Sequence, residues 1–156
     1  MKRVLIFITF FCLISFKVFA QENLLKQVNN ITTLEMKFTD DKCGEWGGNE
    51  TKIIVYRNTF NGQLLADYSV RNMDCYSKDG VKLVKDKKAI VLNTIEIQLI
   101  IDSLEELICQ KINNPTYPSH SGLHSQAKLS DSSLLIDDFP SSDWIKFKEL
   151  SIELEK

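Results

Sequence analysis

The alternation of apolar and polar positions over residues 33–40 predicts a half-buried β-strand. Leu34, Met36 and Phe38 recur with a period of two and therefore share one face of that strand. The next ten residues, 41–50, are rich in glycine and predict a loop.

Two further apolar segments, 51–60 and 63–71, flank an Asn-Gly pair and predict a β-hairpin. Asn-Gly favours a two-residue turn because both turn positions require a positive φ. With such a turn the numbers of paired residues add up to 123, so that Ile53 faces Val70. This register places mostly apolar side chains on one face of the hairpin.

The second face of this hairpin mixes apolar and polar side chains. It carries Tyr56, Phe60 and Leu65 among hydrophilic neighbours. Two interpretations remain open: the helices of the same domain cover this face, or it presents these three side chains to a partner.

Residues 81–84 and 89–92 predict a second, shorter hairpin with a basic tip over 85–88. Lysines at a sheet edge or turn oppose aggregation between sheets. The alternative is that this tip docks on an anionic surface.

The clearest helical pattern runs from Thr94 to about Ile112. Asn93 is a favourable N-cap residue, and Glu96 stands three positions later, as in a capping box. The apolar stripe of this helix consists of Ile97, Ile100, Ile101, Leu104, Leu107, Ile108 and Ile112.

The C-terminal part predicts two strands, near 125–129 and 134–137, and a closing helix over about 142–154. The inner face of that helix is formed by Trp144, Phe147, Leu150 and Leu154, with Asp143 in its first turn. The fold class that follows is α+β, an antiparallel sheet of about five to seven strands with two amphipathic helices packed on one face.

The first twenty residues have the composition of a secretory signal peptide. Lys2 and Arg3 precede an apolar run over 4–14, which is shorter than the roughly 20 residues of a membrane span. The segment ends on Ala20 in an A-x-A-like context. We therefore expect export to the periplasm or the medium, a single domain over 21–156, and no membrane span after cleavage.

Cleavage would also change the charge of the chain. The whole sequence has 19 basic and 21 acidic residues, and the signal segment holds three of the basic ones, which leaves a formal charge of −5. Because nucleic-acid binding needs clustered Lys and Arg, we expect no nucleic-acid partner.

Three cysteines follow the signal segment. The hairpin register places Cys75 at the same end as Cys43, and the exported environment is oxidising, so we predict a Cys43–Cys75 disulfide. Cys109 is left over, on the side of its helix away from the centre of the apolar stripe. It is either inert beneath another element or available for pairing between molecules.

The segment from Cys43 to Glu50 holds half of the six glycines of the chain, together with Trp46. A tryptophan on a tight loop is a good anchor for binding a partner. The alternative is that Trp46 folds back as a plug over the sheet. Glu45 lies beside it in either case.

No complete catalytic or metal-binding motif is present. His120 and His124 have a spacing suited to a metal only on a helix, which Pro118 and Gly122 oppose. The acidic residues of the C-terminal part lack the EF-hand pattern. We expect no cofactor and no metal.

These observations favour an exported, non-catalytic module that binds another protein, of the inhibitor or immunity type. The candidate binding residues are Glu45, Trp46, Tyr56, Phe60 and Leu65. One alternative is a small secreted hydrolase or metal-dependent enzyme that uses the 116–133 loop. Another is a structural envelope protein.

Overall fold

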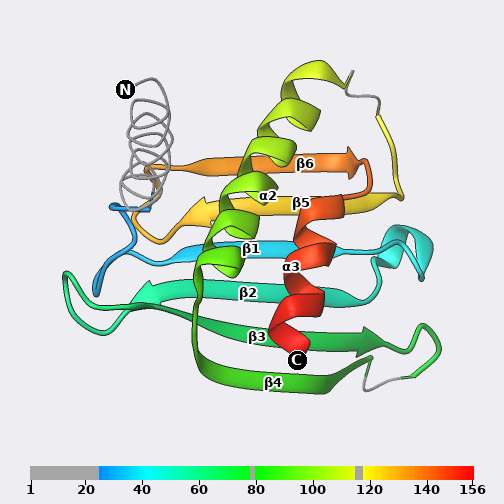
Figure 1. Ribbon diagram of the computed structural model, residues 1–156. Coiled ribbons are helices and arrows are strands. Elements are labelled where there is room, and N and C mark those ends of the chain that lie inside the picture. Colours follow the sequence, from blue (N-terminus) through cyan, green and yellow to red (C-terminus); the bar gives the residue numbers. More distant parts are fainter. Residues whose placement is uncertain (1–24, 78–79, 115–117) are drawn as a thin grey trace, which may run out of the picture.

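The computed structural model describes residues 25–77, 80–114 and 118–156. Six strands form one antiparallel sheet in the order β4-β3-β2-β1-β5-β6, and two helices cross the same face of it (Figure 1). The elements are β1 (Leu34–Thr39), η1 (Gly44–Trp46), β2 (Glu50–Arg57), β3 (Leu64–Met73), β4 (Val81–Val91), α2 (Thr94–Asn113), β5 (Leu123–Leu129), β6 (Leu135–Ser141) and α3 (Ile145–Glu155). The predicted α+β class is confirmed.

Strand β1 lies inside the sheet, paired with β2 on one side and β5 on the other. Its predicted apolar face is buried beneath the helices. On the open face, the Glu35 carboxylate contacts Lys52 Nζ at 2.7 Å and Lys128 Nζ at 3.1 Å. Burial alone would raise the pKa of Glu35, but the two lysines outweigh burial and hold it below its ordinary value.

The hairpin of β2 and β3 exists, but its predicted register is wrong by two residues. Ile53 faces Tyr68, not Val70, because the connection is a six-residue loop. The Asn-Gly pair does not adopt the positive φ values that a two-residue turn requires. The Arg57 guanidinium instead donates to the Gly62 carbonyl and, at 2.9 Å, to the Val28 carbonyl. A shift of two preserves the faces, so Ile53 is buried in the core and Val70 is partly buried against it.

The second predicted hairpin, over residues 81–84 and 89–92, does not form. Residues 81–91 form the single strand β4, which pairs with β3 along its length and contains two register shifts. The lysines expected at a turn have anionic or carbonyl partners instead. Lys85 contacts Glu155, Lys87 donates to two carbonyls of α3, and Lys88 contacts Asp67. Most of the predicted basic tip is therefore paired within the molecule.

Helix α2 begins as predicted. The Asn93 side chain accepts from the backbone N–H of Ile95 and Glu96, and the Glu96 carboxylate accepts from the Asn93 N–H at 2.6 Å. Ile100, Ile101 and Leu107 of its apolar stripe are buried, and Ile97 and Leu104 are partly buried against the core. The last two members of the stripe, Ile108 and Ile112, are exposed instead.

Helix α3 starts at Ile145, later than predicted, so that Asp143 precedes the helix. Trp144 is fully buried at this start, and its indole N–H donates to the Ser103 carbonyl of α2 at 2.7 Å. Trp144 also stacks on Phe147, with ring centroids 4.5 Å apart. The four residues predicted for the inner face of this helix are all buried, with Trp144 at the residue before α3 and the other three within it.

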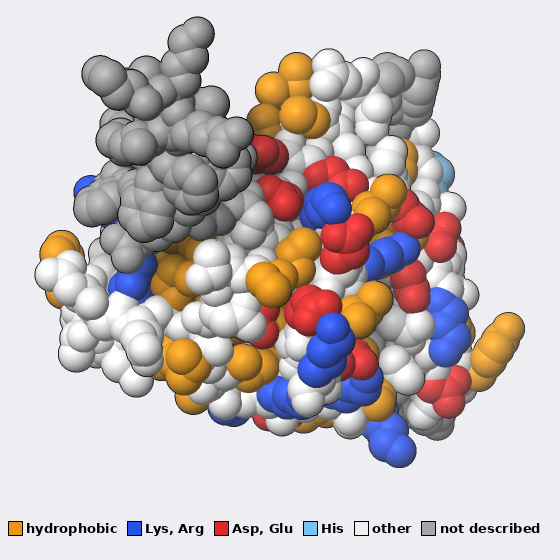
Figure 2. All heavy atoms as spheres, viewed as in Figure 1, with side chains coloured by type: hydrophobic (Ala, Val, Ile, Leu, Met, Phe, Trp, Pro, Cys, Tyr) orange, Lys and Arg blue, Asp and Glu red, His pale blue; other side chains and the backbone are white. Residues whose placement is uncertain are grey.

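The helix-covered face is not dominated by one charge. Figure 2 shows acidic and basic side chains interspersed over the helices, with separate hydrophobic side chains among them. No helix within the described part of the chain is long and apolar enough to cross a membrane.

Candidate functional site

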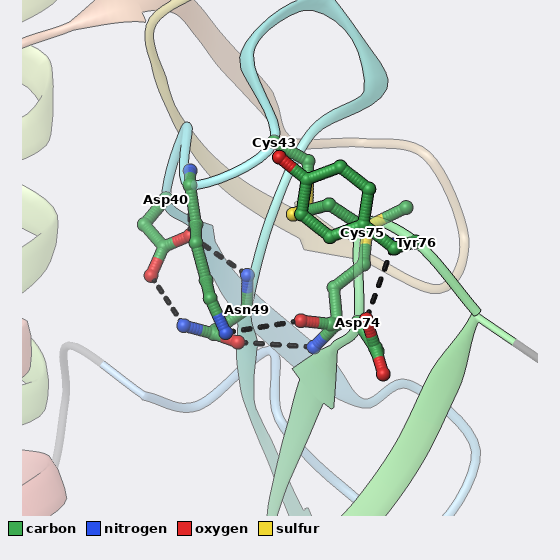
Figure 3. Close-up of a disulfide and its surroundings, with 8 residues drawn as sticks. Asp40, Cys43, Asn49, Asp74, Cys75 and Tyr76 are labelled. Carbon is green, nitrogen blue, oxygen red and sulfur yellow. Dashed lines mark hydrogen bonds between the residues drawn. A yellow bond between two sulfur atoms is a disulfide. The ribbon is translucent and has the colours of Figure 1, made fainter.

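The glycine-rich loop between β1 and β2 is closed at its base by two side chains (Figure 3). The Asp40 carboxylate accepts from the Asn49 backbone N–H at 2.7 Å and from the Asn49 side-chain amide at 2.8 Å. A Cβ at Gly48 would stand 1.9 Å from the Asp40 carboxylate, so only glycine fits there. Gly47, with a φ of +82°, ends the short helix η1 in a conformation that L side chains rarely adopt. The loop is therefore ordered without help from the helices.

The second loop of the site connects β3 with β4 and is joined covalently to the first. Cys43 and Cys75 form the predicted disulfide, with their Cα atoms 5.4 Å apart. Two hydrogen bonds also link the first loop to Met73, the last residue of β3: Met73 N–H donates to Asn49 Oδ1 at 3.0 Å, and Lys42 Nζ donates to the Met73 carbonyl at 3.1 Å. We name the segments 40–49 and 74–77 together the disulfide-linked loops.

These loops carry two exposed aromatic side chains. Trp46 is 76% exposed, so it does not lie as a plug over the sheet, and Tyr76 is 99% exposed. Trp46 ends the single turn that begins at Cys43, and Tyr76 directly follows Cys75. Given the 5.4 Å between the cysteine Cα atoms, the Cα atoms of Trp46 and Tyr76 lie at most roughly 16 Å apart. Sequence reasoning missed Tyr76, although its position next to Cys75 was a usable signal.

Of the other candidate binding residues, Glu45 lies at this site, whereas Tyr56, Phe60 and Leu65 do not. Glu45 is exposed beside Trp46, but Phe60 lies in the loop at the opposite end of the β2–β3 hairpin. The eight residues of β2 separate these ends by roughly 25 Å. Leu65 is only 7% exposed and offers little surface to a partner.

Tyr56 lies next to Leu65 across the hairpin, on the sheet face opposite α2 and α3. These two helices therefore do not cover it, contrary to one of the two interpretations. The Tyr56 hydroxyl donates to Asp67 Oδ1 at 3.1 Å. Burial and the Asp67 carboxylate both raise the pKa of Tyr56. Its polar end is thus already occupied within the molecule.

Away from these loops, a hollow of about 490 Å³ is lined by Lys111, His124, Asp137 and Phe139. His124 Nε2 lies 2.5 Å from Asp137 Oδ1, and the Phe139 ring meets the imidazole edge-on. A histidine–carboxylate pair is half of a hydrolytic site, which also needs a nucleophile or a metal. The described residues contain no group of three or more His, Cys, Asp or Glu side chains placed to hold a metal.

Cys109 is exposed on α2 and has a free thiol. The interpretation that another element covers Cys109 is therefore wrong for the described residues.

Comparisons of this chain with protein-family models, with curated protein sequences and with solved structures find no match.

Proposed function

We propose that this chain is an exported, non-catalytic module that binds another protein, of the inhibitor or immunity type, through the disulfide-linked loops. The observation that carries the proposal is the exposure of Trp46 and Tyr76 on two loops joined by the Cys43–Cys75 bond. Trp and Tyr are enriched among the residues that dominate the binding energy of protein interfaces, and here one of each lies exposed on the joined loops.

The rigidity of the loops supports the same proposal. Binding orders side chains and loops at a cost of free energy, and preorganised segments avoid much of that cost. Here the disulfide, the Asp40–Asn49 contacts and the Met73–Asn49 hydrogen bond order the loops before any partner arrives.

Export is part of the proposal. The signal-like segment that ends at Ala20 supports it, and so does the disulfide, because such bonds persist mainly in oxidising compartments.

The test is capture of envelope and culture-fluid proteins from the source organism by the immobilised exported chain, compared with Trp46→Ala. We expect one stoichiometric partner whose affinity falls about 30-fold or more on Trp46→Ala, since truncation of an anchor costs about 2 kcal/mol. Phe60→Ala is the matched control, because Phe60 is 69% exposed but lies at the other end of the hairpin.

Two outcomes would contradict the proposal. One is a partner that binds Trp46→Ala as tightly as the unaltered chain. The other is a loss of binding that follows Phe60→Ala and not Trp46→Ala. Thermal unfolding of both variants should match that of the unaltered chain, which excludes misfolding as the cause.

A further inference from the structure

Strand β4 forms one edge of the sheet, and its first residues have exposed apolar side chains. Val81 is 56% exposed, Leu83 51% and Val84 49%. The Asp74 N–H of the disulfide-linked loops donates to the carbonyl of Gly80, directly before Val81, so this edge adjoins those loops. A hollow of about 450 Å³ lies at the same place and is lined by Asp74, Ser77, Gly80, Val81, Lys82 and Leu83.

The hydrogen-bond pattern shows which backbone groups of this edge lack a partner in β3. Asp74 N–H donates to the Gly80 carbonyl at 2.8 Å, in register with the pairs that follow. Bonded and unbonded pairs alternate in an antiparallel ladder. Lys82 therefore directs its backbone N–H and carbonyl toward β3, whereas Val81 and Leu83 direct theirs away from the sheet.

The rest of β4 is less suited to pairing. A register shift at Val84 ends the regular segment, and a second shift with a positive φ at Ala89 interrupts the strand again. Bulges and lysines are common protections of sheet edges. The regular segment Val81–Leu83 has neither a bulge nor an ion pair, since Lys82 has no charge partner among the described residues.

We propose that the outer edge of β4 at Val81–Leu83 binds an extended segment of the partner, which adds a short antiparallel or parallel strand to the sheet. This inference rests on the proposed function and names the kind of partner segment. Only an extended backbone presents alternating donors and acceptors that match those of Val81 and Leu83. Lys82 favours an acidic residue in that segment, and Val81 and Leu83 favour apolar ones.

The test uses a library of random linear heptapeptides displayed on phage and selected on the immobilised exported chain. Selected peptides are then synthesised and measured against variants. Leu83→Pro removes an outward N–H while leaving the pairing with β3 intact, so it should weaken binding at least tenfold. Leu135→Pro is the matched control, because Leu135 begins the opposite edge strand β6 and is also exposed.

Two further measurements do not depend on whether the proline variant folds. Lys82→Glu should weaken the binding of acidic peptides several-fold without disturbing the backbone. Amide hydrogen exchange of Val81 and Leu83 should slow when a selected peptide is added to the unaltered chain.

The inference fails if no peptide is selected, if Leu83→Pro and Leu135→Pro bind equally, or if the two amides gain no protection. Peptides lost on Trp46→Ala but retained by Leu83→Pro would support the proposed function and overturn this inference. A protein partner lost on Trp46→Ala, together with an unsuccessful peptide selection, would separate the two proposals in the same way.

Discussion

The hydroxyl of Tyr68 should contribute to a loss of folding stability at alkaline pH, and Tyr68→Phe should remove that contribution. Tyr68 is 1% exposed in the core, and its hydroxyl donates to Glu155 Oε1 at 2.6 Å near the end of α3. Burial and the Glu155 carboxylate both raise the pKa of Tyr68 far above its ordinary value. The folded protein therefore keeps Tyr68 protonated at a pH at which the unfolded chain ionises it.

The expected changes in the free energy of unfolding at pH 8 and pH 11 follow from these contacts. At pH 8 the variant loses one hydrogen bond, and because Glu155 is partly exposed and can bind water instead, the loss should be about 1 kcal/mol. A raised pKa contributes stability that is complete below the unfolded pKa of about 10 and is lost above it. At pH 11, ionisation of Tyr68 in the unfolded chain costs the unaltered protein about 1.4 kcal/mol, a loss that the phenylalanine variant does not have.

Urea unfolding at pH 8 and pH 11 measures both free energies. The unaltered protein should be the more stable at pH 8, and the variant should equal or exceed it at pH 11. Titration of other groups affects both proteins alike and cancels in the comparison. Tyr76→Phe is the control, because Tyr76 is fully exposed and its hydroxyl lies outside the core. An equal difference between Tyr68→Phe and the unaltered protein at both pH values would refute the reasoning.

Three further changes have definite expected outcomes. Replacing both Cys43 and Cys75 with serine removes the cross-link over 32 residues. On the chain-entropy model this should lower the free energy of urea unfolding by roughly 3.5 kcal/mol, and an unchanged unfolding midpoint would contradict that expectation. Asn93→Ala should cost about 1 kcal/mol by removing the N-cap of α2, and Asn93→Ser should recover most of this loss, which thermal unfolding can check. Trp144→Phe should cost roughly 2 to 4 kcal/mol, because it removes buried volume and the hydrogen bond to Ser103, and a loss below 1 kcal/mol in the same assay would argue against that contact.

Local signals in the sequence predicted the elements of the fold well. Alternation identified β1, the Asn93–Glu96 pair located the start of α2, and the spacing from Trp144 to Leu154 identified the buried face of α3. These signals operate within one element, where a strand or helix fixes the direction of each side chain.

The errors arose where distant contacts decide the outcome. The turn after β2 depends on the Arg57 guanidinium, which contacts Val28 and Gly62, and not on the Asn-Gly pair alone. The lysines of β4 continue a strand because Glu155, some 70 residues later, supplies the anionic partner of Lys85. No local pattern contains that information.

The candidate site was predicted in part for the same reason. Trp46, Glu45 and the disulfide all lie within or next to one unusual loop. Phe60 was grouped with them because it belongs to the hairpin that follows this loop. That hairpin is long, however, and Phe60 lies at the end opposite the disulfide-linked loops.

The contacts that order the disulfide-linked loops, the proposed binding site, are separate from those that stabilise the helix layer. Strand β3 takes part in both, through Met73 at the loops and Tyr68 beneath α3. The hydrogen bonds that order the loops involve Asp40, Asn49 and Met73, and none of these residues contacts a helix through them. Changes that loosen the helix layer should therefore lower the free energy of unfolding while leaving the affinity for a partner nearly constant, as long as the chain remains folded.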